Sequence, residues 1–148
     1  MLTEEVGSHQ VLMLGLAGEV FALDARLIRE ILDPIAVTRV PGAKHFVSSV
    51  LNVRGKVIPL ADLRQRFGMP PAAATPDTRI IVIETDIGGE PTTVGIIADK
   101  VHEVTELDHA SLQAPPPVGM RWQPEFIAAI GKWKTDFIVV PNLERIFN

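Results

Sequence analysis

The stretch 49–68 constrains the fold more than any other part of the 148-residue chain, because it specifies a complete strand–turn–strand–helix unit. Two apolar runs flank a tight turn at Arg54 and Gly55, and a glycine there supplies the positive φ that a short hairpin needs. Asp62 stands at an N-cap position and Gly68 at a C′ position, which predicts a short helix between them. This unit would hold Arg54 at an exposed tip.

The same pattern recurs eighty residues later, where residues 125–148 lie over residues 45–68 without a gap. Identical residues occupy four aligned pairs: Phe46/Phe126, Ile58/Ile138, Leu63/Leu143 and Phe67/Phe147. The N-caps and the turn cations also correspond, as Asp62/Asn142 and Arg54/Lys134, and a fainter echo pairs residues 28–31 with 101–104. We interpret this as an internal duplication that produces two similar small β-barrels. The alternative is that strand–turn–helix units resemble one another through patterning alone.

The rest of the chain is rich in short apolar runs separated by proline and glycine, which favours a β-rich fold. We expect residues 1–8 to be a flexible terminus and residues 69–77, rich in proline and alanine, to be a linker. The remaining expected elements are strands at 9–16, 20–23, 35–40, 78–85 and 137–140, an extended region at 92–104 bent near Asp99, a helix at 25–32 capped by Asp24, a helical turn at 107–112 and a terminal helix from Leu143.

Composition narrows the function classes. Hydrophobic residues at 47% and charged residues at 22% are typical of a globular chain, and the apolar runs are far shorter than the ~20 residues of a spanning helix. The absence of cysteine excludes disulfides and thiolate metal sites and fits a cytoplasmic protein. A net charge of −4 argues against nucleic acid as the partner. We therefore expect neither nucleic-acid binding nor membrane insertion.

Catalytic motifs are not evident. Four histidines are dispersed without metal-ligand spacing, and no nucleophile elbow or phosphate-binding loop occurs. Asp24, Asp62 and Asp99 stand near predicted element boundaries, where capping is their expected role. We thus predict no enzyme activity, no metal and no cofactor. The competing hypothesis from another class is a small β-barrel enzyme or ligand-binding protein that uses the cleft between the barrels, with Asp99 or His102 as its first candidates.

The run 51–64, Leu-Asn-Val-Arg-Gly-Lys-Val-Ile-Pro-Leu-Ala-Asp-Leu-Arg, resembles the signature of CheW, the chemotaxis coupling protein family. The resemblance continues at 28–32, at 94–101 and at the terminal strand and helix, so it covers residues 9–148. It implies a mainly β fold of two SH3-like five-stranded β-barrels packed together, with short helices. We expect a single domain at 9–148, with one subdomain formed by 9–68 plus the end of the chain and the other by 78–136.

The resemblance also implies a function. CheW-like proteins are cytoplasmic, non-catalytic adaptors that link the cytoplasmic tips of methyl-accepting chemoreceptors to the regulatory domain of a CheA-type histidine kinase in membrane-associated arrays. Flanking charges set the register of such a contact while apolar side chains supply its affinity. Whether this chain serves the chemotaxis array or a pilus or other signalling array is left open by the sequence.

Candidate contact residues follow from the resemblance, position by position. The receptor-facing positions are Ile28, Glu30, Ser49, Asn52 and Arg54, and the kinase-facing positions are Val118 and Met120. The simpler interpretation of Glu30 and Arg54 is a solvated helix face and a solvated turn. Three residues depart from the family pattern: Ser49 and its repeat equivalent Ala129 replace a usual glycine, and Pro141 replaces an aliphatic residue, which indicates a sheet edge or a strand end.

Overall fold

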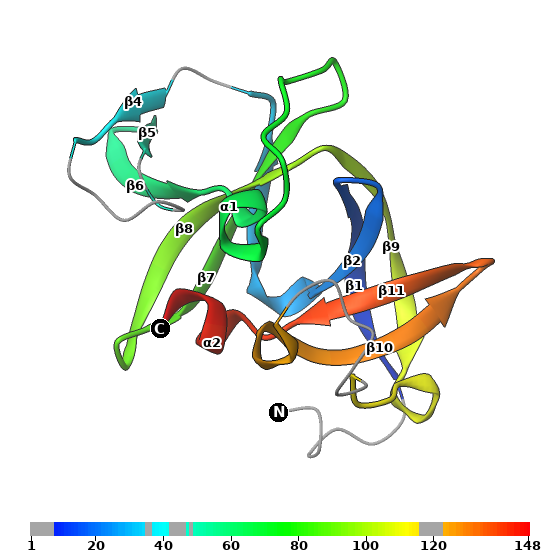
Figure 1. Cartoon of the computed structure of the whole chain (residues 1–148). Helices are drawn as coiled ribbons and strands as arrows, with labels where there is room; N and C mark the ends of the chain where they lie inside the picture. Colours follow the sequence, from blue (N-terminus) through cyan, green and yellow to red (C-terminus); the bar gives the residue numbers. More distant parts are fainter. Residues whose placement is uncertain (1–7, 35–36, 42–46, 48, 116–122) are drawn as a thin grey trace.

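The structure is a computed structural model that describes residues 8–34, 37–41, 47, 49–115 and 123–148. Its strands form two sheets, each curled into a small barrel (Figure 1). Barrel A consists, in spatial order, of β10 (Ile127–Trp133), β11 (Asp136–Pro141), β2 (Glu19–Asp24), β1 (Ser8–Leu16) and β9 (Lys100–Asp108). Barrel B consists of β3 (Ile28–Leu32), β7 (Arg79–Ile87), β8 (Glu90–Ala98), β6 (Lys56–Ala61), β5 (Ser49–Val53) and β4 (Val37–Arg39). The mainly β prediction is confirmed.

The barrels divide the chain differently from the expected subdomains. The strands of barrel B are consecutive, from Ile28 at the start of β3 to Ala98 at the end of β8, so the segment 69–77 is a loop inside one barrel and not a linker between two. Barrel A joins the N-terminal hairpin to residues 100–141. The reason is that β6 pairs in parallel with β8, and β11 pairs in parallel with β2. Turn residues in the sequence specify local hairpins and not such distant pairings.

The duplication is visible in the structure. β6 and β11 have identical bounds after the eighty-residue shift, and so do helices α1 (Leu63–Phe67) and α2 (Leu143–Phe147). The hairpin registers agree as well, since Ser49 pairs with Leu60 and its equivalent Ala129 pairs with Val140. The side chains of Asp62 and Asn142 cap the two helices, and Gly68 ends α1 in the left-handed conformation, as predicted.

The predicted helix at 25–32 is wrong. Asp24 caps only one 3-10 turn, η2 (Ala25–Leu27), after which the chain continues as the edge strand β3. Ile31 and Leu32 pair there with the β-branched strand β7. Apolar residues at 27, 28, 31 and 32 satisfy a helical spacing, but pairing with β7 overrides that local preference. Glu30 therefore stands on a strand and not on a helix.

The other expected elements agree with the structure in outline. The region at 92–104 is two strands, β8 and β9, that meet at Asp99, and the terminal helix is α2. The expected strand at 35–40 contains β4, although residues 35–36 lie outside the described residues. The helical turn at 107–112 is limited to η4 (His109–Ser111), because β9 extends to Asp108. The flexible terminus lies outside the described residues except for Ser8, which begins β1.

Buried side chains form three cores, two inside the barrels and one larger core, the seam, between them. β7 shows the arrangement: Ile80 and Val82 fill barrel B, while Ile81 and Ile83 enter the seam. The seam also contains the rings of Phe21 and Phe67, which stack at 5.5 Å between centroids. Strands covered on both faces are continuously apolar, which explains the run at 80–83.

One ion pair ties the barrels together at the point where the chain crosses between them. Arg64 on α1 is buried, and its Nη1 donates to Asp99 Oδ1 at 2.6 Å while its Nη2 donates to Asp99 Oδ2. Asp99 also accepts the backbone N–H of Ala17, in the β1–β2 turn, at 2.8 Å. The hydrogen bonds from Arg64 lower the pKa of Asp99 against the opposing effect of burial. Asp99 thus joins α1, the β8–β9 corner and the β1–β2 turn.

We predict that Asp99→Asn lowers the free energy of unfolding at pH 7 by about 2 kcal/mol, because it leaves the buried Arg64 without its anion. The figure is below that of a fully buried pair, since the Asp99 side chain is 36% exposed. Because the pKa of Asp99 is lowered in the folded protein, its charged form stabilises the fold at pH values above the ordinary carboxyl pKa. This stability is lost as the pH falls below about 4. Urea unfolding at pH 7 and pH 3 should therefore show a smaller difference between variant and wild type in acid; an equal difference at both pH values would contradict this account.

Candidate functional surface

Glu30 and Arg54 form a bidentate ion pair that bridges barrel B. Arg54 Nη1 lies 2.5 Å from Glu30 Oε2, and Nη2 lies 2.8 Å from Oε1. Glu30 stands on β3 at one edge of the sheet and Arg54 in the β5–β6 turn near the other, so the pair joins two ends of a curled sheet. The Glu30 side chain is 23% exposed and that of Arg54 is 76% exposed. Arg54 can thus meet a partner while Glu30 holds one side of its guanidinium.

The turn that carries Arg54 has the geometry of a tight two-residue loop. Arg54 and Gly55 have φ values of 53° and 83°, and Val53 pairs with Lys56 across them. Such a turn matches the right-handed twist of the flanking strands. Asn52 Oδ1 accepts the N–H of Gly55 at 2.8 Å, which fixes the loop. Asn52 therefore has a structural role in presenting Arg54.

Hydrogen bonding across the pair favours both charged forms. The hydrogen bonds from Arg54 lower the pKa of Glu30, and those from Glu30 raise the pKa of Arg54. Both groups therefore stay charged at neutral pH. They line a cavity of about 280 Å³ with Arg29, Val53, Lys56, Ile58, Val82 and Thr93. The surface offers a partner fixed charges around an apolar floor.

A β-bulge separates Ile28 from Glu30. Ile28 pairs with Ile83 and Glu30 with Val82, so Arg29 is the extra residue of the bulge. Ile28 packs against the seam while Glu30 reaches the mouth of barrel B. Ile28, the predicted neighbour of Glu30, is thus placed on a different face of the strand.

The departures from the family pattern are accommodated. Ser49 is half-buried in β5 without a positive φ, and Ala129 is buried at the equivalent position of β10. Pro141 is the last residue of β11, as predicted for a strand end, although β11 is an inner strand of barrel A. Val118 and Met120, the predicted kinase-facing residues, lie outside the described residues.

The structure adds two apolar residues that the sequence analysis did not select. Ile31, next to Glu30, and Val57, three residues after Arg54, are exposed, Val57 by 63%. Both lie on the outer face of their strands, whereas Glu30 and Arg54 lie over the interior of barrel B with Ile58 and Val82. Exposed apolar side chains on a sheet face are typical of protein interfaces. A signal was present, because β6 alternates and Val57 must face away from the buried Ile58.

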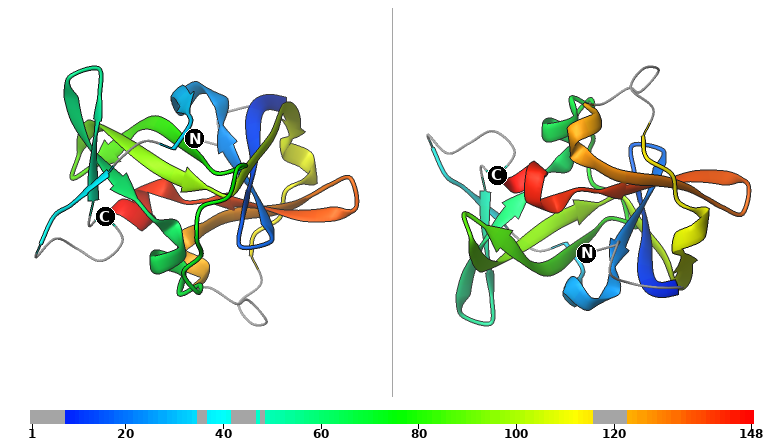
Figure 2. Two further views of the ribbon diagram at one scale, coloured as in Figure 1. Left: turned by 90° about the horizontal axis from the view of Figure 1, so that it is seen from above. Right: turned by 90° about the horizontal axis from the view of Figure 1, so that it is seen from below.

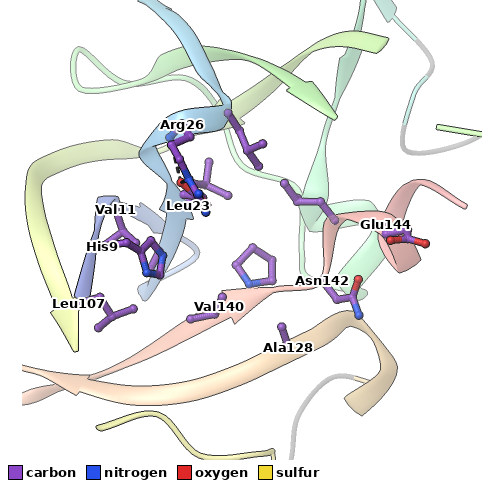
Figure 3. Close-up of a pocket in the computed structure, with 14 residues that line it drawn as sticks. His9, Val11, Leu23, Arg26, Leu107, Ala128, Val140, Asn142 and Glu144 are labelled. Carbon is purple, nitrogen blue, oxygen red and sulfur yellow. Dashed lines mark hydrogen bonds and ion pairs between the residues drawn. The ribbon is translucent and has the colours of Figure 1, made fainter. Parts of the chain in front are cut away.

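A larger cavity, of about 450 Å³, lies beside α2 and is mostly apolar (Figure 3). It is lined by His9, Val11, Ala22, Leu23, Asp24, Arg26, Leu27, Leu107, Ala128, Val140, Pro141, Asn142, Leu143 and Glu144. Asp24 and Arg26 pair with each other at its rim, at 2.7 Å. Across the part of the chain that the structure describes, no three metal-ligating side chains are close enough to hold an ion.

The residues of the enzyme hypothesis have structural partners. Asp99 is held by Arg64 and Ala17, as described above, and the ring of His102 packs against Trp133 at 5.7 Å between centroids. Within the described ranges, no helix is long and apolar enough to cross a membrane.

Comparison with known proteins shows which family has this architecture. The family model for the CheW-like domain matches residues 10–148. The chain belongs to the CheW-like family. A solved relative, the scaffolding protein TtCheW of Thermoanaerobacter tengcongensis, is 33% identical and superimposes with a TM-score of 0.84 over 95% of this chain and 88% of its own. The fold is therefore that of the family, two SH3-like barrels.

Other relatives carry two different names. The chemotaxis protein CheW of Bacillus subtilis is 30% identical over 78% of this chain and 72% of its own length. That of Klebsiella aerogenes is 24% identical over 99% and 86%. Protein PilI of Pseudomonas aeruginosa is 29% identical over 76% and 62%. The chain is thus similar to proteins named as chemotaxis proteins, to one named as a scaffolding protein and to one named PilI.

We predict that Glu30→Gln changes stability only slightly, because an ion pair whose Arg54 side chain is 76% exposed contributes little to folding. The change should be largest at low ionic strength and should vanish in high salt, where exposed charges are screened. Urea midpoints of both proteins in low and high salt test this. A large loss of stability that persists in high salt would show that the pair is needed to hold barrel B together.

Proposed function

We propose that this CheW-like protein is a non-catalytic adaptor that couples the cytoplasmic tips of methyl-accepting chemoreceptors to the regulatory domain of a CheA-type histidine kinase. The observation that carries the proposal is the exposed Arg54, held by Glu30, with the exposed apolar side chains Ile31 and Val57 on the strands that carry the pair, in a chain that belongs to this family. We call these four residues the barrel B surface. On this proposal the protein acts in the cytoplasm and is recruited to membrane-associated arrays.

A receptor tip is a helical hairpin, and the barrel B surface has the chemistry to bind one. Ile31 and Val57 can cover an apolar stripe of a helix, while the exposed side of Arg54 selects a carboxylate beside that stripe. Charges at such a rim set the register and reject wrong partners, and the apolar contacts supply most of the affinity.

The likeness to PilI supports a second version of the same role, an adaptor in a pilus or other non-flagellar array. Both versions use the same surface and differ in the receptor that docks there. Binding to receptor tips from the two kinds of array, measured side by side, distinguishes them.

We expect Arg54→Glu to weaken binding of a receptor tip fragment by at least about tenfold, because the partner's carboxylate would then meet a like charge. Binding of the kinase regulatory domain should change much less. Calorimetric titration with each partner measures both effects, with the melting curve as the check on the fold. Equal loss of both affinities with an unchanged melting curve would contradict the assignment of the barrel B surface.

The charge-swapped double variant Glu30→Arg/Arg54→Glu is the matched control. It restores an ion pair across barrel B but reverses the charges that the partner meets. If the pair acts only on the fold, the swap recovers receptor binding. If Arg54 contacts the receptor directly, the swap stays defective, which is the result we expect.

A further inference from the structure

The ion pair of the barrel B surface occurs a second time, on barrel A. Glu103 on β9 and Lys134 in the β10–β11 turn lie 3.3 Å apart, between Oε1 and Nζ. Lys134 is the repeat equivalent of Arg54, and its φ of 57° matches the 53° of Arg54. Glu103 corresponds to Glu30 through the echo of 28–31 at 101–104. Each pair thus joins the two edge regions of its own curled sheet.

The exposed apolar neighbours are repeated as well. Ile31 corresponds to Val104, and Val57 corresponds to Phe137, all four being exposed. Phe137 is 68% exposed, more than any other large apolar side chain among the described residues. The next two residues of β11, Ile138 and Val139, fill barrel A and the seam. Neither core includes Phe137.

The copy on barrel A differs in its cations. Lys132 takes the place of Asn52, and its Nζ lies 5.7 Å from the centre of the Phe137 ring. Lys134 Nζ lies 4.6 Å from the Trp133 ring. Lys132 forms no ion pair with any described residue, whereas Arg54 is held in a bidentate pair. Phe137 is therefore an exposed aromatic anchor beside one ammonium group, that of Lys132, while Lys134 adds a second cation at the tip of the same hairpin, over Trp133.

We infer that Val104, Lys132, Lys134 and Phe137, the barrel A surface, bind the adaptor's second partner through a pocket on the kinase regulatory domain that has an apolar floor and a carboxylate rim. An exposed phenylalanine with a lysine over its ring complements such a pocket, since the ring is desolvated there while the ammonium groups of the hairpin meet the acidic rim. This inference rests on the proposed function, which requires a second surface.

The positions of the two hairpins allow simultaneous binding. The β10–β11 hairpin and the β5–β6 hairpin project from opposite ends of the molecule (Figure 2). A partner on one surface therefore leaves the other accessible. Duplication of one unit, followed by change at Asn52/Lys132 and Val57/Phe137, accounts for two surfaces of related shape and different selectivity.

The test is calorimetric titration of four full-length proteins with the kinase regulatory domain and, separately, with the receptor tip fragment. The proteins are wild type, Lys132→Glu, Phe137→Ser and the matched control Val57→Ser. We expect both barrel A variants to lose at least about tenfold in kinase affinity and to keep receptor affinity. Val57→Ser should show the opposite pattern.

The outcomes separate this inference from the proposed function. Wild type that binds neither partner overturns the proposed function, and this inference with it. If wild type binds both partners and the barrel A variants match it in kinase affinity, this inference alone is overturned. It is also overturned if Lys132→Glu loses both affinities equally with an unchanged melting curve. If Phe137→Ser melts early, Lys132→Glu decides, because its side chain is exposed and pairs with no described acid.

Discussion

The apolar seam between the two barrels is the contact on which the rest of the structure depends. Each barrel has only a small interior of its own. The outer faces of its strands are buried against the other barrel, and together they form the larger core. Domains this small bury too little surface on their own to be stable by a wide margin. The ion pair between Arg64 and Asp99 then fixes the crossing point of the chain at the border of the seam. Two hairpins can project from the ends because the two barrels share one core.

The sequence predicted local units well and their assembly less well. Asp62, Gly55 and Gly68 specify caps and a turn through interactions within a few residues, and all three behave as predicted. Barrel membership was missed, because β6 meets β8 and β11 meets β2 in parallel across distant parts of the chain. β3 was assigned to a helix because its apolar residues recur at helical spacing, and pairing with β7 overrides that spacing.

The candidate site was predictable to a similar degree. The family resemblance selected Glu30 and Arg54, and the structure shows that they bind each other. It could not place Ile28, because the bulge at Arg29 shifts the alternation of side chains along β3. Val57 and Phe137 were overlooked although alternation along β6 and β11 turns them away from the buried Ile58 and Ile138. Whether that outer face is exposed or covered depends on where the seam ends, which is a property of the packed barrels.

An adaptor must hold two partners at once, and a duplicated fold with one charged, apolar surface at each end is a direct way to do so. The most direct test is the mass, by light scattering, of a mixture of this protein, a receptor tip fragment and a kinase regulatory domain. The account predicts a ternary complex that contains all three components. Displacement of one partner by the other, with only binary complexes at any concentration, would contradict it.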